Sequence, residues 1–396
     1  MLLCLPTIFR PLNILANKKT NKYIKKSKNF PYFCLFIIKT IFYRFLFNID
    51  FSKKMKKTIL FTLLYILFAQ MAAAQAGSSI FGFLGLPSSL RAAALGGTNV
   101  SLHDDDLSFT LQNPALITGE MHNQIALNFT SYLADINFGS AAYSYKLNDN
   151  NYLAAGVHYI NYGKFDERND YGEKLGEFSA NDVALHLIYG RKLSEKWTLG
   201  ATLKPIFSVY EQYSSFGLGV DAGLSYFLAK NKFSAALVFK NIGRQLSAYY
   251  YAEGKQHFEP FPFEIQAGAT KRLAHAPFQI SITAHNLQRW DMSYAGYTRS
   301  ENGEKPENEL SFGQNLIRHF IFGVDFLPSD KFFISAGYNC RRNQELKVNS
   351  RSLNGFTFGG GLKLYKFKLG FALAKYHPSN LSYHFSIATN LSSFNF

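Results

Sequence analysis

The sequence predicts an all-β fold, a fourteen-stranded antiparallel transmembrane β-barrel with an N-terminal plug or hatch segment. Three observations support this prediction. Apolar and polar side chains alternate along most of the chain, and many alternating segments reach the roughly nine to eleven residues that a tilted strand needs to cross an outer membrane. Aromatic residues make up 16% of the chain and recur near strand ends, where membrane barrels carry interfacial girdles. The connections between strands also alternate between short and long.

The start of the mature protein lies well inside the chain. Residues 55–76 read MKKTILFTLLYILFAQMAAAQA, with two lysines, a short apolar run and an alanine-rich cleavage region. This order is typical of a secretory signal peptide, and its apolar run is too short for a permanent membrane span. We therefore expect export through a signal peptide that starts at Met55.

Residues 1–54 are interpreted as a mis-called start that is not part of the native protein. They are rich in Lys, Asn, Phe, Ile and Tyr and contain one acidic residue, Asp50. The alternative is a membrane-anchoring leader around 31–47. That stretch carries Lys39 and Arg44 near its middle, where charges are costly in a bilayer.

Most of the positive charge belongs to these first segments. The whole chain is formally +15, but residues 1–54 hold eleven Lys or Arg against one Asp, and the signal peptide adds two lysines, which leaves about +3. This removes the main support for nucleic-acid binding, so we expect no nucleic-acid partner. Only Cys340 lies in the mature chain, which excludes an intramolecular disulfide and a cysteine-cluster metal site.

Strand alternation is clear in single segments. In 381–391, Leu381, Tyr383 and Phe385 share one face, while Ser382 and His384 lie on the other. A period of two is that of a β-strand whose faces meet different surroundings. The expected strands are 124–132, 139–147, 151–163, 179–192, 197–210, 215–229, 232–245, 262–273, 278–290, 317–327, 331–341, 355–365, 367–376 and 381–391.

Link lengths predict which barrel end faces which compartment. Links after even-numbered strands are short, such as 146–151 and 193–196, whereas those after odd-numbered strands include long ones, such as 164–178 and 290–315. Short periplasmic turns and long external loops are typical of outer-membrane barrels. Closure is required because an unpaired strand edge in lipid leaves backbone N–H and C=O groups without partners. We expect the barrel to occupy 121–396.

The barrel interior is expected to be plugged. Lumen-facing positions are mostly small, with single charges such as Asp221, Asp325 and Lys240. Residues 77–120 precede the first strand and are long enough to fold inward. We expect this segment to form the N-terminal plug.

Two motifs stand out in the plug. Asn113-Pro114-Ala115 is interpreted as a hatch turn, because proline fixes φ and asparagine before it favours a turn. Asp104, Asp105 and Asp106 form an acidic cluster. Carboxylates are hard oxygen ligands, but this run lacks the alternating ligand spacing of a calcium loop. A solvated turn, or one paired with Arg91, is the favoured interpretation.

The chemistry-bearing motifs of common enzymes are absent from the sequence. It contains no G-x-S-x-G or S-x-x-K nucleophile motif, no H-E-x-x-H and no Walker loop. His186, His285 and His384 face the lumen by alternation, but a metal site would need them to meet across the barrel. We expect no enzyme, no catalytic residue, no metal and no cofactor.

One long loop is a candidate partner-binding surface. The segment 247–263 is rich in aromatic residues and poor in charge. Exposed aromatic clusters favour partner contact, although an ordinary interfacial girdle is an equal alternative. The candidate residues are Tyr249, Tyr250, Tyr251, Phe258 and Phe261.

The plug sequence resembles a known family. SIFGFLGLPSSLRAAALGG at 79–97, followed by DDDLSFTLQNPAL at 104–116, is similar to the N-terminal hatch of the long-chain fatty-acid transporter superfamily. Within it, the likeness is to the PorV/PorQ branch of the type IX secretion system of Bacteroidetes. The resemblance covers the mature chain and implies a barrel of fourteen strands.

The resemblance implies a non-enzymatic outer-membrane component of type IX protein secretion. Such a barrel would hold surface partners of the attachment complex that links cargo to anionic lipopolysaccharide. The implied partners are outer-membrane lipid, a surface accessory protein, a sortase and a PorV-like barrel. Two alternatives stay open, an outer-membrane transporter of hydrophobic compounds and a general porin.

Overall fold

The computed structural model describes residues 79–249, 251–252, 255–290, 292, 311–346, 353–377 and 380–394. The predicted mis-called start, 1–54, and the predicted signal peptide, 55–76, lie outside the described residues. Within the described part, no helix is both long and apolar enough to cross a bilayer.

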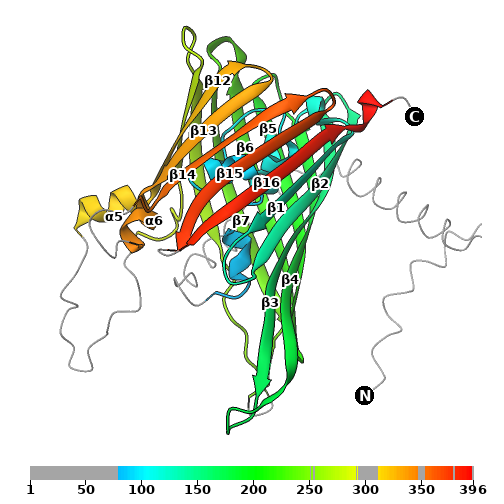
Figure 1. Cartoon of the computed structure of the whole chain (residues 1–396). Helices are drawn as coiled ribbons and strands as arrows, with labels where there is room; N and C mark the ends of the chain where they lie inside the picture. The colour runs from blue at the N-terminus through cyan, green and yellow to red at the C-terminus, as the bar shows by residue number, and fades with distance from the viewer. Residues whose placement is uncertain are drawn as a thin grey trace, which may run out of the picture. The chain divides into compact units, whose positions relative to one another are not determined.

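Fourteen antiparallel strands close into one barrel, as the alternation predicted (Figure 1). They are β1 (Gln124–Ser131), β2 (Asn137–Asn148), β3 (Asn151–Arg168), β4 (Lys174–Lys192), β5 (Trp197–Tyr210), β6 (Tyr213–Leu228), β7 (Phe233–Ser247), β10 (Glu264–Arg272), β11 (Phe278–Ala284), β12 (Phe320–Ser329), β13 (Phe332–Asn339), β14 (Phe356–Leu364), β15 (Phe367–His377) and β16 (Asn380–Asn390). Two short strands, β8 (Tyr251–Ala252) and β9 (Lys255–Gln256), pair with each other in the loop after β7.

Short helices complete the described elements. The 3₁₀ turns are η2 (Gly82–Gly85), η3 (Leu107–Leu111), η4 (Pro114–Leu116), η5 (Gly119–Met121), η6 (Ala229–Asn231) and η7 (Leu391–Ser393). The α-helices are α4 (Leu90–Ala94), α5 (Phe312–Arg318) and α6 (Cys340–Glu345).

The first and last strands close the barrel. β1 pairs with β16 without interruption, from Gln124 opposite Asn390 to Ser131 opposite Tyr383. Along β16, Tyr383 and Phe385 are 43% and 48% exposed, whereas Ser382 and His384 are each 2% exposed. The outer face is therefore apolar and the inner face polar, which is what a lipid-embedded wall requires.

The two rims of the barrel differ. One rim, called the short-turn rim, carries the tight turns and the C-terminal end of β16 (Figure 1). The other, called the long-loop rim, carries the long connections, α5 and α6, and the far end of the β3–β4 hairpin (Figure 1). The predicted alternation of link lengths is present in the structure.

Several predicted boundaries were wrong. The segment 164–178 was predicted as a loop, but β3 and β4 run through most of it. Ion pairs link the two strands there, including Lys174 Nζ to Asp166 Oδ1 at 2.8 Å. Gly172, with φ of 81°, lies in the connection between these strands. Backbone pairing and ion pairs therefore extend the β3–β4 hairpin beyond the length that is needed to cross the membrane.

Other errors lie in the segments predicted as loops or strand ends. β11 ends at Ala284, before the predicted 290, because Asn286 adopts a left-handed φ of 54°. Helix α5 begins at a capping box in which Ser311 and Gln314 satisfy each other's backbone N–H groups. Helix α6 begins after Asn339, whose side chain accepts from Arg342 N.

The described plug, residues 79–121, lies inside the barrel. Its α4 contacts β14 and β15, and its η4 contacts β5 and β6. Apolar plug side chains such as Leu95, Leu107 and Phe109 are almost fully buried. The core of the molecule therefore sits between the plug and the inner wall.

Candidate functional site

The hatch turn packs directly on the barrel wall. Asn113 Oδ1 accepts from Ala115 N at 2.9 Å, and Asn113 Nδ2 donates to Val100 O at 2.7 Å. The Asn113 side chain thus closes the turn and ties it to the plug backbone at Val100. Asn113, Pro114 and Ala115 are all buried.

Glycines in the wall make room for this turn. A Cβ at Gly223 would lie 2.1 Å from Asn113 Oδ1, and a Cβ at Gly200 would lie 2.2 Å from the Pro114 carbonyl carbon. Only glycine leaves room for the hatch turn to approach the wall backbone so closely. The structure therefore gives the hatch turn a packing role against β5 and β6.

The acidic cluster takes part in a partly buried charge network at the short-turn end of the plug. Arg91 forms an ion pair with Asp104, and its Nη2 lies 3.3 Å from Asp325 Oδ2 on β12. The predicted pairing of Arg91 with the cluster is present, and the wall carboxylate of Asp325 extends it. Asp105 pairs with Lys368 on β15. The network thus joins the plug to β12 and β15, two strands that are far from the plug in sequence.

Burial and charge act in opposite directions on these carboxyls. Burial alone would raise the pKa of Asp104, but the Arg91 charge and its hydrogen bonds hold it well below its usual range. Burial raises the pKa of Asp105, and the neighbouring Asp104 adds to that rise. Burial also raises the pKa of Asp106, which caps η3 by accepting from Ser108 N. The pKa of Asp104 is therefore lowered, whereas the pKa values of Asp105 and Asp106 are raised.

A cavity of about 520 Å³ opens beside this network. Arg91 and the three aspartates line it, together with basic side chains from the short-turn rim. Those basic residues are Arg272, Lys331, Lys363 and Lys368. In the part of the chain that the structure describes, no group of three His, Cys, Asp or Glu side chains is placed to hold a metal ion.

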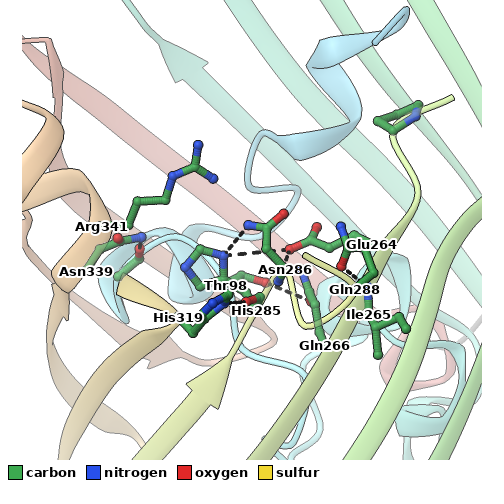
Figure 2. Close-up of polar contacts among 12 residues, drawn as sticks. Thr98, Glu264, Ile265, Gln266, His285, Asn286, Gln288, His319, Asn339 and Arg341 are labelled. Carbon is green, nitrogen blue, oxygen red and sulfur yellow. Dashed lines mark hydrogen bonds and ion pairs between the residues drawn. The ribbon is translucent and has the colours of Figure 1, made fainter. Parts of the chain in front are cut away.

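A second cavity, of about 370 Å³, lies on the long-loop side of the plug and is called the loop-side cavity. Figure 2 shows its polar contacts. His285 Nδ1 lies 2.6 Å from Asn286 Nδ2, and Asn286 N donates to Glu264 Oε1 at 3.3 Å. Thr98 Oγ1 donates toward Gln266 Oε1 at 3.4 Å. The two cavities share no lining residue, and different plug residues line each of them.

Sequence reasoning missed a buried ion pair within the wall. Lys204 Nζ lies 2.7 Å from Asp221 Oδ1, and both side chains are at most 2% exposed. Asn241 N also donates to Asp221 Oδ1, at 2.7 Å, where the β6–β7 register shifts. Alternation placed Asp221 in the lumen, but only the register across neighbouring strands reveals its partner.

The candidate partner-binding loop does not form one exposed surface, and the prediction for Phe261 was wrong. Phe261 is buried in the lumen, where its ring meets Phe81 edge-on at 5.6 Å between centroids. Wall glycines make this possible, since a Cβ at Gly243 would lie 2.9 Å from the Phe261 ring.

The other residues of that loop have different surroundings. Tyr249 is half-buried and donates to Ser208 Oγ at 2.5 Å. Phe258 is 40% exposed, with Arg244 over its ring at 5.4 Å. Tyr250 lies outside the described residues, and Tyr251 is described only by its backbone in β8.

The closed wall, the apolar exterior and the contrasting rims define a class, the plugged transmembrane β-barrel of outer-membrane type. No protein-family model and no curated protein sequence matches the chain.

Solved outer-membrane barrels are similar in fold. The Pseudomonas putida toluene transporter TodX has 12% identity and a TM-score of 0.46, with 76% of this chain and 96% of TodX covered. A Pseudomonas aeruginosa FadL homologue has 10% identity and a TM-score of 0.43, with 80% of this chain and all (100%) of the homologue covered. The KdgM porin has 6% identity and a TM-score of 0.30, with 67% and 98% covered. At these identities the similarity concerns the barrel fold alone.

Proposed function

We propose that this protein is a non-enzymatic, PorQ-like component of the type IX secretion apparatus that holds surface partners at its long-loop rim. The resemblance of the plug sequence to the PorV/PorQ branch supports the type IX assignment. The implied partners are the surface accessory protein, the sortase and a PorV-like barrel of the attachment complex.

The observation that carries the proposal is the attachment of the plug to the wall. Arg91 lies between Asp104 and Asp325, Asp105 pairs with Lys368, and the hatch turn packs on wall glycines. Removing one partner of a buried ion pair costs several kcal/mol, so a plug held by such pairs resists displacement. A fixed plug is consistent with a scaffold role, in which the barrel binds surface partners at its long-loop rim.

The long-loop rim offers a surface for such partners. Five exposed apolar side chains lie on α5 and in the segment that follows β11, and we name them the α5 patch: Leu287, Trp290, Phe312, Leu316 and Ile317. Phe312 is 70% exposed, and its ring lies 4.8 Å from that of Trp290. Exposed aromatic clusters of this kind favour protein contact. The α5 patch therefore replaces Phe261 as the apolar surface for a partner.

Deletion of the gene in the native bacterium tests the secretion role. We expect a surface-anchored type IX cargo protein to lose its anchor and to accumulate unmodified in the medium or the periplasm. Complementation with the intact gene should restore anchoring, and complementation with Phe312→Ser/Ile317→Ser should not. Normal anchoring in the deletion strain would overturn the proposal.

Transport of hydrophobic compounds is the second candidate, because a cavity lies on each side of the plug. TodX, whose barrel is similar in fold, is a toluene transporter. Both cavities are lined by several charged side chains, which suits polar ligands better than hydrocarbons. Loss of labelled hydrocarbon uptake in the deletion strain, with cargo anchored normally, would favour this candidate.

A general porin is distinguished by conductance. A water-filled lumen would give steady single-channel currents in planar bilayers. We expect the plugged barrel to give none, and steady currents in the intact protein would contradict a fixed plug.

A further inference from the structure

We propose that the loop-side cavity is a binding site for a small ligand that carries an oxyanion, a phosphate or a carboxylate group. The site combines cations that have no carboxylate partner among the described residues with neutral hydrogen-bond donors, in a cavity on the long-loop side of the plug. This inference is independent of the secretion role.

Two cations of the cavity have no carboxylate partner among the residues that the structure describes. Lys240, on β7, is 8% exposed and lines the cavity, and its side chain makes no hydrogen bond or ion pair to any described residue. Arg342, on α6, also lines the cavity. Its Nη1 is buried without a hydrogen-bond partner among the described residues, and its guanidinium stacks over the Tyr376 ring at 4.3 Å. Burying a charge without a partner costs free energy that a bound anion would recover.

The carboxylates of the cavity are engaged elsewhere. Glu345 Oε1 accepts from Arg341 Nε at 2.6 Å. Glu264 lies opposite Lys240 across the β7–β10 pair, yet its Oε1 accepts from Asn286 N and lies 3.8 Å from His285 Nδ1. Counting these two carboxylates against Lys240, Arg341 and Arg342 leaves the cavity with an excess of one positive charge. Burial accordingly lowers the pKa of Arg342, despite the opposing effect of Glu345.

Neutral donors surround the cations. Thr98 Oγ1 faces the Oε1 atoms of Gln112 and Gln266, at 3.2 Å and 3.4 Å. Both glutamines line the cavity, and neither NH₂ group is bonded to a described residue. His285 is nine-tenths buried, and its Nε2 has no partner in the described part of the chain.

These groups suit an oxyanion. A guanidinium binds carboxylate and phosphate through paired N–H groups, an ammonium adds a point charge, and amide N–H groups fill the remaining oxygen lone pairs. A cavity of about 370 Å³ falls in the size range of small-molecule sites and leaves room for more than the anionic group itself. The ligand class is therefore a small organic phosphate or carboxylate.

Calorimetric titration of the full chain in detergent tests the site. Inorganic phosphate and acetate are the two probes, each titrated at an ionic strength held constant with chloride. We expect saturable one-to-one binding of at least one probe, weakened at least tenfold in Lys240→Met and in Arg342→Gln. The probe that binds identifies the group as phosphate or carboxylate. Lys331→Met removes one cation at the opposite rim and is the matched control, with unchanged binding.

A third variant keeps the test decisive if those proteins fold poorly. Gln266→Glu places a carboxylate on the same face as Lys240, on the neighbouring strand. It should abolish probe binding and raise the thermal unfolding temperature, because it compensates the cations. Heat-dependent migration on SDS gels shows whether each barrel is folded. The proposal is overturned if neither probe binds, or if the folded variants bind as tightly as Lys331→Met.

Discussion

The plug meets the barrel in different ways at its two ends. At the short-turn end, the buried cation Arg91 has two carboxylate partners, Asp104 and Asp325, and the half-buried Lys368 has Asp105. At the long-loop end, Lys240 and Arg342 line a cavity without a carboxylate partner among the described residues.

This difference in charge compensation suggests a different role for each end of the plug. A compensated buried pair mainly fixes geometry, because breaking it costs more than making it gains. An uncompensated cation in a cavity is unfavourable until an anion arrives, which is the condition for binding. We therefore assign attachment of the plug to the short-turn end and ligand recognition to the long-loop end.

The largest effect is expected from Arg91→Met. This change leaves Asp325, which is 1% exposed, and Asp104 without their shared cation. Breaking a buried pair by removing one partner typically costs about 3–5 kcal/mol. The urea midpoint of the barrel in detergent should fall, and trypsin should cleave the plug faster.

Arg168→Met is the control for that experiment. Its ion pair with Asp166 lies on the exposed hairpin beyond the membrane wall. Exposed pairs contribute little, so both the urea midpoint and the cleavage rate should stay unchanged. Equal behaviour of the two variants would contradict the attachment role of Arg91.

A smaller effect is expected from Gly223→Ala. The added Cβ would lie 2.1 Å from Asn113 Oδ1, so the hatch turn must shift away from β6. Overpacking of this kind costs about 1–3 kcal/mol. Gly82→Ala is the matched control, because a Cβ there meets no atom within 4 Å. A lower melting temperature for Gly223→Ala alone would establish the close contact, and identical temperatures would refute it.

The barrel was predictable from sequence because its signal is local. Each strand repeats the same alternation, as with Tyr383 facing outward and His384 inward, and closure follows from the cost of unpaired edges in lipid. The extended β3–β4 hairpin was missed because strand pairing outside the membrane needs no apolar face. Exposed ion pairs such as Lys174 with Asp166 leave a pattern that resembles a solvated loop.

The candidate site was harder to predict because its contacts join distant residues. The sequence indicated Arg91 as a partner of the acidic cluster, but Asp325 lies 234 residues away and only the closed barrel brings the two together. Phe261 belongs to a segment whose composition is typical of an exposed aromatic loop. Its ring lies in the lumen instead, where glycines on β6 and β7 leave room for it. Lys240 was predicted to face the lumen, but only the three-dimensional arrangement shows that its ammonium has no carboxylate partner among the described residues.

The smallest effect is expected from pH, and Asp106→Asn isolates it. Burial raises the pKa of Asp106 in the folded protein, against the opposing effects of Arg91 and Lys368 and together with that of Asp104. A raised carboxyl pKa means that the folded state binds the proton more tightly, so stability should increase as pH falls from neutral toward the unfolded value near 4. The pKa of Asp105 is raised in the same way, whereas the stabilisation from Asp104 is lost only below that pH.

The Asp106→Asn variant tests this expectation, because asparagine keeps the cap on Ser108 N but cannot titrate. The urea midpoint measured between pH 7 and pH 4 should therefore rise less in the variant than in the native protein. An equal rise of the urea midpoint in both proteins would show that the Asp106 carboxyl does not contribute to the pH dependence. It would then follow that nearby cations offset the effect of burial on Asp106.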